Sequence, residues 1–347
     1  MTAVGQPPQP TSDRTELRGG HPDRSGQARL VLTEVGRAVV KLVSTLVVAS
    51  ILVFAATSAI PGNSGRAVLG KFATPGQIRA FNVRFGLTKP LAEQYWLWIS
   101  KFVRGDFGIS YTSGTSVADT LGPRLSRSVF LGAYGFLIAV VVAIPLGLYA
   151  ARRSGHKDDM ALSGLTVTVG ALPEFVIGIL LIAIFGVWLP LLPVSSTQVG
   201  LASSPWSALS YYTLPACAVA LTIAPYVLRM VRANGREILH QPYIQAATLR
   251  GLSPTRLMGR HVWPNAAPPV VNVLAMQFAA IISGVVITES VFGIPGVGQL
   301  LIQATANHDV PVVLAITLLT GAVYVIVNLV ADLAVQVLTP RLRTAAR

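Results

Sequence analysis

Six long apolar runs separated by polar segments form the main pattern along this chain. A transmembrane helix needs about 20 consecutive apolar residues, and each run comes close to that length. The pattern therefore predicts an all-α polytopic membrane protein with six transmembrane helices. The runs cover residues 42–60, 128–151, 162–185, 213–228, 270–288 and 312–333.

The composition agrees with this class. Hydrophobic residues make up 52% of the chain and charged residues only 12%, whereas soluble domains carry about 25% charged residues. Cys217 is the single cysteine and lies within an apolar run. One cysteine excludes an intrachain disulfide and a cysteine-based metal cluster.

Positive charge is distributed unevenly between the two sides of the predicted membrane. The short loops 192–212 and 292–310 contain no Lys or Arg, so they are expected to face outside. Both termini are then cytoplasmic and the chain lies in the cell membrane. The net charge of +13 reflects this asymmetry, and no basic stripe with interleaved aromatic residues indicates a nucleic-acid partner. The Lys and Arg residues assigned to the cytoplasmic side lie in 1–41, 152–157, 229–260 and 341–347.

The same pattern predicts the domain organisation. The N-terminal segment is rich in Pro, Gly, Ser and Arg and has no apolar periodicity, which is typical of disorder. It is too long for the polar region of a signal peptide, so the first run reads as a retained span. The predicted parts are a disordered cytoplasmic extension at 1–35, a first span at 36–60, an external subdomain at 61–127, a five-helix core at 128–340 that includes a cytoplasmic loop at 232–268, and a cytoplasmic tail at 341–347.

The external segment is expected to be helical. Thr74 is predicted to be the N-cap of a helix, and Pro75 then occupies its first helical position. Further on, an apolar stripe at helical spacing predicts a second helix, which either lies on the bilayer or the spans or docks an external partner, and both uses are compatible. The stripe consists of Leu91, Tyr95, Trp98 and Phe102.

The sequence contains no complete nucleotide-binding motif. Residues 65–71 read GRAVLGK and match the start of a phosphate loop, but Phe72 replaces the Ser or Thr that would hold magnesium. The histidines are scattered over both sides and form no catalytic cluster. We therefore expect no catalytic chemistry and no cofactor in this chain, and if ATP powers the protein, another chain binds it.

A basic loop between the fourth and fifth runs carries the most specific pattern. Ala246 and Ala247 are small and favour a helix that can approach another surface closely. Gly251 can turn the chain before a second short helix at Ser253-Pro254, and Arg256 follows on that helix. On periodicity alone, the loop is either a docking site or an amphipathic segment that meets anionic lipid.

The spacing of Gln245, Ala246, Ala247 and Gly251 resembles the E-A-A-x-x-x-G loop of ABC importer permeases. The longer stretch YIQAATLRGLSPTRLMGRHVWPNAAP is similar to the oligopeptide and dipeptide permease version of that loop. Three more blocks resemble the same subfamily in the same order, so the resemblance extends over residues 35–345. These blocks are FGLTKPLAEQYWLWISKFVRGDFGIS, GVVITESVFGIPGVGQL and NLVADLAVQVLTPRLR.

This resemblance implies a type I ABC importer permease fold and a set of partners. Two permeases form the pore, two ATPase subunits bind inside, and an extracytoplasmic binding protein delivers di- or oligopeptides. The long segment between the first two spans is similar to that of the B-type permease, whose partner is a C-type permease. Carried onto this sequence, the ATPase-coupling residues are Tyr243, Gln245, Ala246, Ala247, Gly251 and Arg256.

The chain departs from the family pattern at several positions. Gln245 replaces the glutamate, so any contact made there must be a neutral hydrogen bond. Thr248 and Leu249 replace the usual Arg-Ala, and Thr339 stands where aspartate is common.

Polar residues within the runs are candidates for the translocation path, because such residues are costly in a membrane. Glu174 either lines the path and meets a peptide amino terminus or packs inside the bundle. Glu289 near the outer end of the fifth run is either a gate residue or a structural cap. Asn272 and Gln277 are path candidates or interhelical hydrogen-bond partners, and Asp332 is expected at the membrane interface.

Two alternatives remain for the activity. Nickel and glutathione importers share these motifs. The motifs therefore do not distinguish a peptide importer from an importer of nickel or glutathione. An ion-coupled secondary transporter would use Glu174 as a proton site, although no inverted repeat is apparent.

Overall fold

In the computed structural model, the described residues are 24–59, 64–70, 72–197 and 205–338. They form two compact units, Met1–Val43 and Ser44–Arg347, and all regular structure within the described ranges is helical. The predictions for residues before Arg24, for Ile60, for Thr339 and for the tail lie outside these ranges. The elements are α1 (Arg24–Ala59), α2 (Ser64–Leu69), α3 (Pro75–Arg84), α4 (Leu91–Val103), α5 (Val117–Arg152), α6 (Lys157–Ala171), α7 (Glu174–Leu181), a π-helical segment (Ile182–Trp188), α8 (Pro205–Leu239), α9 (Pro242–Leu249), α10 (Pro254–Leu257), a second π-helical segment (Met258–Val262), α11 (Trp263–Phe292), α12 (Val297–Ala306) and α13 (Val310–Leu338).

The all-α polytopic architecture predicted from the sequence is confirmed. Within the described residues, four helices are long and apolar enough to cross a membrane, and the number rises to six if each of two bent helix pairs counts as one span. α1 already begins at Arg24, so it covers residues 24–35, which the sequence pattern had assigned to the disordered extension. The four straight candidates are Leu42–Ala59, Val117–Arg152, Ala208–Leu239 and Val310–Val330.

The third apolar run is not the continuous span that the sequence pattern predicted. It breaks between α6 and α7, whose axes are bent by 106° when the π-helical segment is included. Leu172 adopts an extended conformation with ψ of 134°, because the ring of Pro173 disfavours a helical residue before it. The break places Glu174 at the first turn of α7.

A stripe of small residues runs along α5. Gly135, Ala139, Ala143, Gly147 and Ala151 recur at every fourth position, which keeps them on one face of the helix, and all five are buried. Within a membrane, small residues allow two helix backbones to approach closely and gain van der Waals contact. The stripe therefore marks the face of α5 that packs against another helix.

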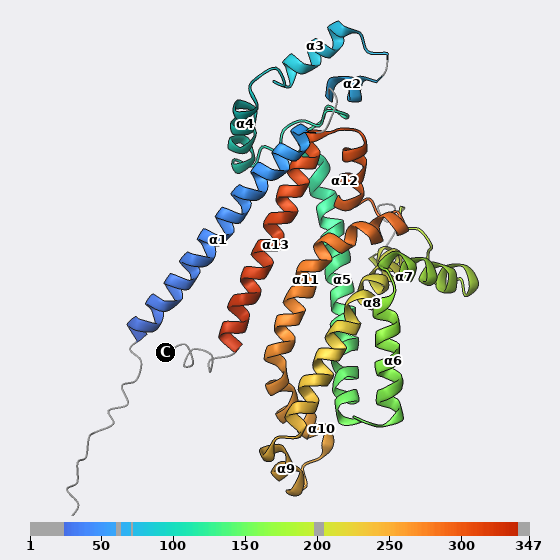
Figure 1. Cartoon of the computed structure of the whole chain (residues 1–347). Coiled ribbons are helices and arrows are strands. Elements are labelled where there is room, and N and C mark those ends of the chain that lie inside the picture. The colour runs from blue at the N-terminus through green and yellow to red at the C-terminus, as the bar shows by residue number, and fades with distance from the viewer. Residues whose placement is uncertain (1–23, 60–63, 71, 198–204, 339–347) are drawn as a thin grey trace, which may run out of the picture. The chain divides into compact units, whose positions relative to one another are not determined.

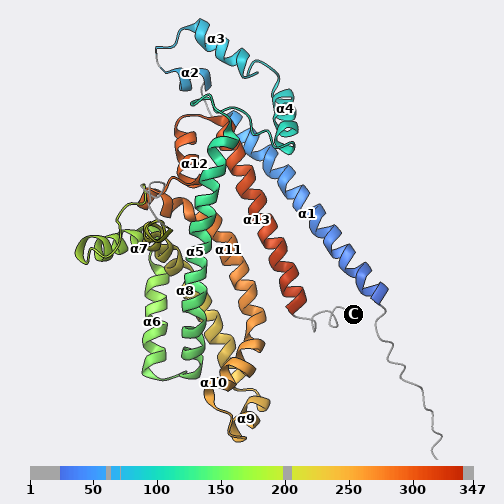
Figure 2. The same ribbon diagram turned by 180° about the vertical axis from the view of Figure 1, so that it is seen from behind.

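That other helix is α8, which runs beside α5 over most of its length (Figures 1 and 2). An added Cβ at Gly135 would lie 2.8 Å from the Cβ of Val219, and one at Gly147 would lie 2.7 Å from the Cβ of Val231. At the end of the helix pair the glycine lies on α8 instead of α5, because Gly235 of α8 faces Ala151 of α5. Valine side chains thus fill the hollows that the glycines leave.

α11 and α7 complete the core against α8, and α6 packs along α8 as well. At its end, α11 turns sharply into α12, with an angle of 85° between Gly284–Phe292 and Val297–Ala306. Gly293 takes a left-handed conformation in this turn, with φ of +67°. α12 then leads through Asp309 into α13, which packs back on α11.

The helical segment between the first two spans follows the sequence prediction closely at one point. Thr74 caps α3 in a complete capping box, in which the Thr74 side chain accepts from the Gln77 amide and Gln77 accepts from the Thr74 amide. α4 packs through Tyr95 and Trp98 on Phe54 of α1.

A buried carboxylate holds the chain after α4 in place. Asp309 accepts hydrogen bonds from the Tyr111 amide at 3.0 Å, from the Thr112 hydroxyl at 2.7 Å and from Ser110. Burial of a charge is tolerated where several donors surround it. The loop before α5 is thereby tied to the start of α13, although the two are far apart in the sequence.

The α5–α8 contact gives a stability prediction. Gly147→Val forces a branched side chain against Val231 and should cost about 1–3 kcal/mol through overpacking, or prevent folding. Gly164→Val on α6 is the matched control, because nothing lies within 4 Å of a Cβ there. Size-exclusion chromatography in detergent and the thermal midpoint of the folded fraction measure the effect; equal behaviour of the two variants would contradict it.

Candidate coupling loop and translocation path

The loop between α8 and α11 folds into two short helices joined by a glycine. α9 follows α8 directly, with Pro242 at its first position and Gln241 as an extended N-cap. Gly251 ends α9 with φ of +79°, a conformation that an L side chain rarely adopts. The Leu252 amide donates to the Ala247 carbonyl and the Gly251 amide to that of Thr248, which is the hydrogen-bond pattern of a Schellman cap.

One face of the loop is packed inward. Ile244 of α9, Leu257 of α10 and Val262 are buried together against the end of α8. Ala247 lies beside this cluster and is half-buried, whereas Ala246 is exposed. The two alanines that the sequence analysis treated alike therefore differ: Ala247 lets α9 pack closely on its own subunit, and only Ala246 faces outward.

The other face of α9 is open to solvent. Tyr243 is 49% exposed and Leu249 is 90% exposed, and Gln245 lies on the surface with a 3.5 Å contact from its side-chain nitrogen to the His240 carbonyl. Arg256 is exposed on α10. In the sequence, Leu249 stands out only as a departure from the family pattern. A leucine at the last position of a helix in a basic loop was the signal that could have marked it as a contact residue.

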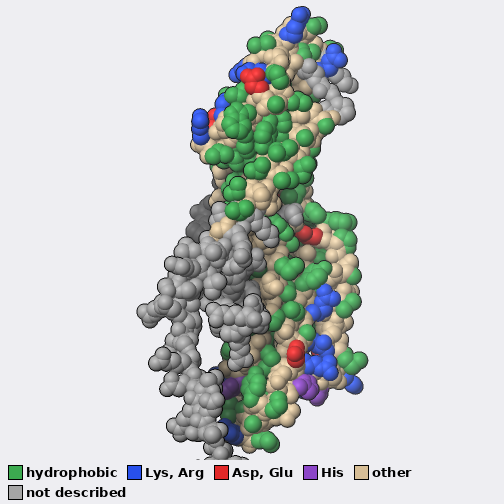
Figure 3. Space-filling view, turned by 60° about the vertical axis from the view of Figure 1, so that its left-hand side comes forward, with side chains coloured by type: hydrophobic (Ala, Val, Ile, Leu, Met, Phe, Trp, Pro, Cys, Tyr) green, Lys and Arg blue, Asp and Glu red, His purple; other side chains and the backbone are tan. Residues whose placement is uncertain are grey.

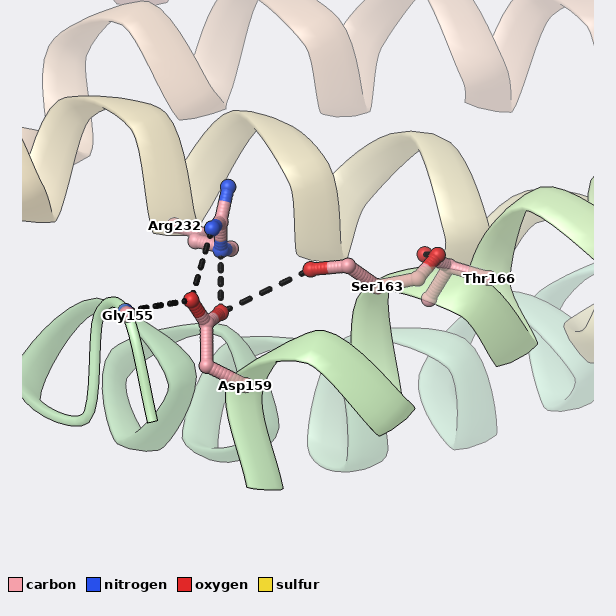
Figure 4. Close-up of polar contacts among 5 residues, drawn as sticks. All are labelled: Gly155, Asp159, Ser163, Thr166 and Arg232. Atoms are coloured by element: carbon pink, nitrogen blue, oxygen red, sulfur yellow. Dashed lines mark hydrogen bonds and ion pairs between the residues drawn. The ribbon is translucent and has the colours of Figure 1, made fainter. Parts of the chain in front are cut away.

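A buried ion pair joins α6 to α8 near this loop (Figure 4). Arg232 donates to both oxygens of Asp159, with Nη2 at 2.8 Å from Oδ2, and Asp159 is 2% exposed. The Gly155 amide donates to Oδ2 at 3.0 Å, and Ser163 lies at 3.5 Å from Oδ1. Asp159 also sits in the first turn of α6, where a negative charge is favoured. The sequence analysis did not identify this pair.

The bend between α6 and α7 is held against α11. The Thr288 hydroxyl donates to Oε1 of Glu174, and Gly284 packs against its other oxygen, 3.2 Å from where a Cβ would stand. Glu174 and Gln277 line one cavity of about 70 Å³ between α7, α8 and α11, together with Thr222. The structure thus brings two of the predicted path residues together.

Glu289 lies elsewhere and is fully buried at the α11–α12 turn. Its Oε2 accepts from the Gly298 amide at 2.8 Å and from the Gln299 amide at 3.2 Å, so it caps the start of α12, and it also accepts from Ser128 of α5. An added Cβ at Gly296 would lie 2.0 Å from the carboxylate, so only glycine fits there.

Glu289 also borders a cavity of about 770 Å³, which lies between α5, α11, α12 and α13. Its lining is mostly apolar, and Thr317 and Thr320 are among its few polar residues.

Asn272 does not share the cavity of Gln277. Positions five apart on an α-helix point about 140° from one another, and Asn272 is exposed on α11. The side chain of Asp332 lies outside the described residues.

The apolar spans, the bent helix pairs and the carboxylates held between them define a multi-pass membrane permease. The chain belongs to the family of binding-protein-dependent transport system inner membrane components, whose model matches residues 143–344. A second model, for the N-terminal part of such membrane components, matches residues 31–132. The protein is thus a permease subunit of an ABC importer, a family that works with ATPase and binding-protein partners.

Relatives of known name support this assignment. The chain is 32% identical over 310 residues to a probable peptide ABC transporter permease protein, y4tP, of Sinorhizobium fredii, covering 88% of this chain and 98% of that protein. It is 31% identical over 305 residues to the glutathione transport system permease protein GsiC of Escherichia coli, covering 87% and 96%. A solved structure of the methionine ABC transporter MetNI in inward-facing conformations aligns with a TM-score of 0.49 at 18% identity, over 63% of this chain and 96% of that chain.

The Asp159–Arg232 pair gives a testable expectation. Asp159→Ala leaves the half-buried guanidinium without its counter-charge and should destabilise the protein by about 1–3 kcal/mol. The exchanged pair, Asp159→Arg with Arg232→Asp, should recover part of that loss, because the coupling energy belongs to the pair.

The neighbouring Asp158 is exposed and bonds Tyr149, so Asp158→Ala is the control and should change the thermal midpoint little. Thermal unfolding of the purified protein distinguishes these cases, and an equal loss from both single variants would contradict a special role for Asp159.

Proposed function

We propose that this chain is the B-type permease of an ATP-driven importer of di- and oligopeptides. The exposed face of α9, with Leu249 at its end, carries this proposal, because a well-packed loop that presents an apolar side chain to solvent is suited to dock another protein. The named relatives support a peptide substrate, since one is a probable peptide permease and glutathione is itself a tripeptide.

The proposed complex contains four kinds of chain. This permease pairs with a C-type permease, two ATPase subunits bind on the cytoplasmic side, and an extracytoplasmic binding protein delivers the peptide. ATP and Mg are bound by the ATPases. Both termini and the α9–α10 loop lie in the cytoplasm, as the distribution of Lys and Arg favours.

Coupling is assigned to the loop. We assign direct ATPase contact to the exposed residues Tyr243, Gln245, Ala246, Leu249 and Arg256, whereas Ala247 and Gly251 shape the loop from within. Gln245 makes a neutral contact. α8 continues from the α5 interface into the loop, so a push on α9 is transmitted to the permease core through a rigid helix.

Glu174 and Gln277 are proposed to line the translocation path. Glu174 borders a small, mostly apolar cavity, in which its carboxylate would offer a peptide ammonium group both a counter-charge and hydrogen-bond acceptors. Glu289 is proposed to stabilise the outer gate by holding α12, and Asn272 to face the path from another side of α11.

Uptake into liposomes tests the function as a whole. The reconstituted complex should accumulate labelled dipeptide or oligopeptide only with ATP and binding protein present. Glutathione and nickel serve as comparison substrates. Ion-gradient-driven uptake by this chain alone would contradict the proposal.

Leu249→Asp should abolish peptide-stimulated ATP hydrolysis and uptake while the protein still inserts and assembles with its partner permease. The reason is that a charge replaces the most exposed apolar contact of α9. Thr255→Asp adds the same charge to an exposed position on α10 and should retain activity. Stimulated ATPase activity in the Leu249→Asp complex would rule out this contact.

Glu174→Gln should lower the maximal uptake rate by about 10- to 100-fold, because a charged hydrogen bond is worth about 1.5–3 kcal/mol. Glutamine still accepts from Thr288, so the fold should be kept. Uptake is measured at saturating binding protein, with the thermal midpoint as the control. A variant that transports at the normal rate would limit Glu174 to its bond with Thr288.

A further inference from the structure

α4 carries more apolar surface than its neighbour covers. Tyr95, Trp98 and Phe102 lie on one edge of its apolar arc, and the first two contact Phe54 of α1. Trp96 and Val103 form the other edge: they are seven positions apart, so they share one stripe, and they are 70% and 79% exposed. No described residue of the unit 44–347 covers this second edge.

The contacts with α1 place α4 beside the middle and the C-terminal half of the candidate span Leu42–Ala59. The Ser50 hydroxyl lies 2.8 Å from that of Tyr95, and the rings of Phe54 and Trp98 stack at 5.9 Å. Ser50 and Phe54 precede Ala59, where the candidate span ends, by nine and five residues. At a rise of about 1.5 Å per residue, they lie about 13 Å and 8 Å inside the end of that span.

The opposite arc of α4 carries charged side chains, with Leu97, which is 41% exposed, between them. Glu93 pairs with Lys89 at 2.7 Å, and Lys101 is exposed on the same side of the helix. In the space-filling view, hydrophobic side chains gather on this part of the molecule with charged side chains around them (Figure 3). A helix that packs beside a span and has an apolar arc opposite charged side chains has the form of an interfacial helix.

We propose that the exposed edge of α4 is embedded in lipid at the membrane–water interface, with Trp96 and Val103 among the acyl chains and Glu93 and Lys101 toward water. Tryptophan favours this interface because its ring is apolar and its N–H remains hydrogen-bonded there. α4 then contacts both the span and the lipid. This contact sets the position, relative to the membrane, of the loop between α4 and α5, which is bonded to Asp309. The proposal is independent of the substrate.

Spin labels test the embedding. Cys217 is the only cysteine, so Cys217→Ser supplies a background for single labels at Trp96→Cys and Val103→Cys, with Glu93→Cys and Lys101→Cys as controls on the opposite arc. Each label is read in the assembled transporter in liposomes, by its collisions with oxygen, which enters lipid, and with a water-soluble nickel chelate.

The ratio of oxygen to nickel collisions should be several-fold higher at 96 and 103 than at 93 and 101. Free access of nickel to 96 and 103 would overturn the proposal in favour of an aqueous surface. Exclusion of both reagents there would overturn it in favour of a covering protein chain. ATP-driven uptake by each labelled complex shows separately that the transporter is folded.

A second measurement avoids cysteine substitution. Brominated lipid should quench the tryptophan fluorescence of the unmodified complex more than that of Trp96→Phe, since the proposal places Trp96 among the acyl chains. The Trp188→Phe variant provides a comparison, because Trp188 is also exposed but lies after α7. Equal quenching of the unmodified and Trp96→Phe complexes would overturn the proposal.

Discussion

The close contact between α5 and α8 forms the centre of the helix bundle, and α6, α7 and α11 pack against α8. Apolar side chains gain nothing by leaving lipid for the interior of a membrane protein, so helices associate there through tight packing. Gly135 and Gly147 allow the α8 backbone to come near enough for Val219 and Val231 to fill the spaces. The result is a stiff pair of helices, one of which continues directly into the loop assigned to ATPase coupling.

Buried carboxylates then fasten the remaining elements to this pair. Asp159 ties α6 to α8, Glu289 ties α12 to α11 and α5, and Asp309 ties the loop before α5 to the start of α13. Each carboxylate receives several donors, which offsets the cost of burying its charge. Glu174 has a single hydrogen-bond donor, Thr288, in the described part of the chain and borders a small cavity that Gln277 also lines. The number of hydrogen-bond donors thus separates the three carboxylates that hold helices together from Glu174, which is proposed to meet a substrate.

Sequence reasoning succeeded where one helix decides the outcome. The cap at Thr74 and the glycine turn at Gly251 follow from local chemistry, and the structure has both of them. Apart from the broken third run, the apolar runs lie in long helices, as predicted. Sequence reasoning failed where packing between helices decides. The break at Pro173 was visible as a proline in an apolar run, but its 106° angle depends on the helices that receive α6 and α7. Ala246 and Ala247 differ only because Ile244 selects the buried face of α9.

The sequence by itself determined that this chain is a multi-pass permease of the binding-protein-dependent family, because hydropathy and motif spacing are properties of contiguous residues. Only the tertiary structure decided which carboxylates hold helices together. It also decided that Leu249 is the most exposed apolar residue of the loop. In α4, it decided that one edge of the apolar arc packs on a span while the other edge stays exposed. Those properties depend on which side chains meet across segments distant in the sequence, since a pattern along one helix records its apolar face but not what covers it.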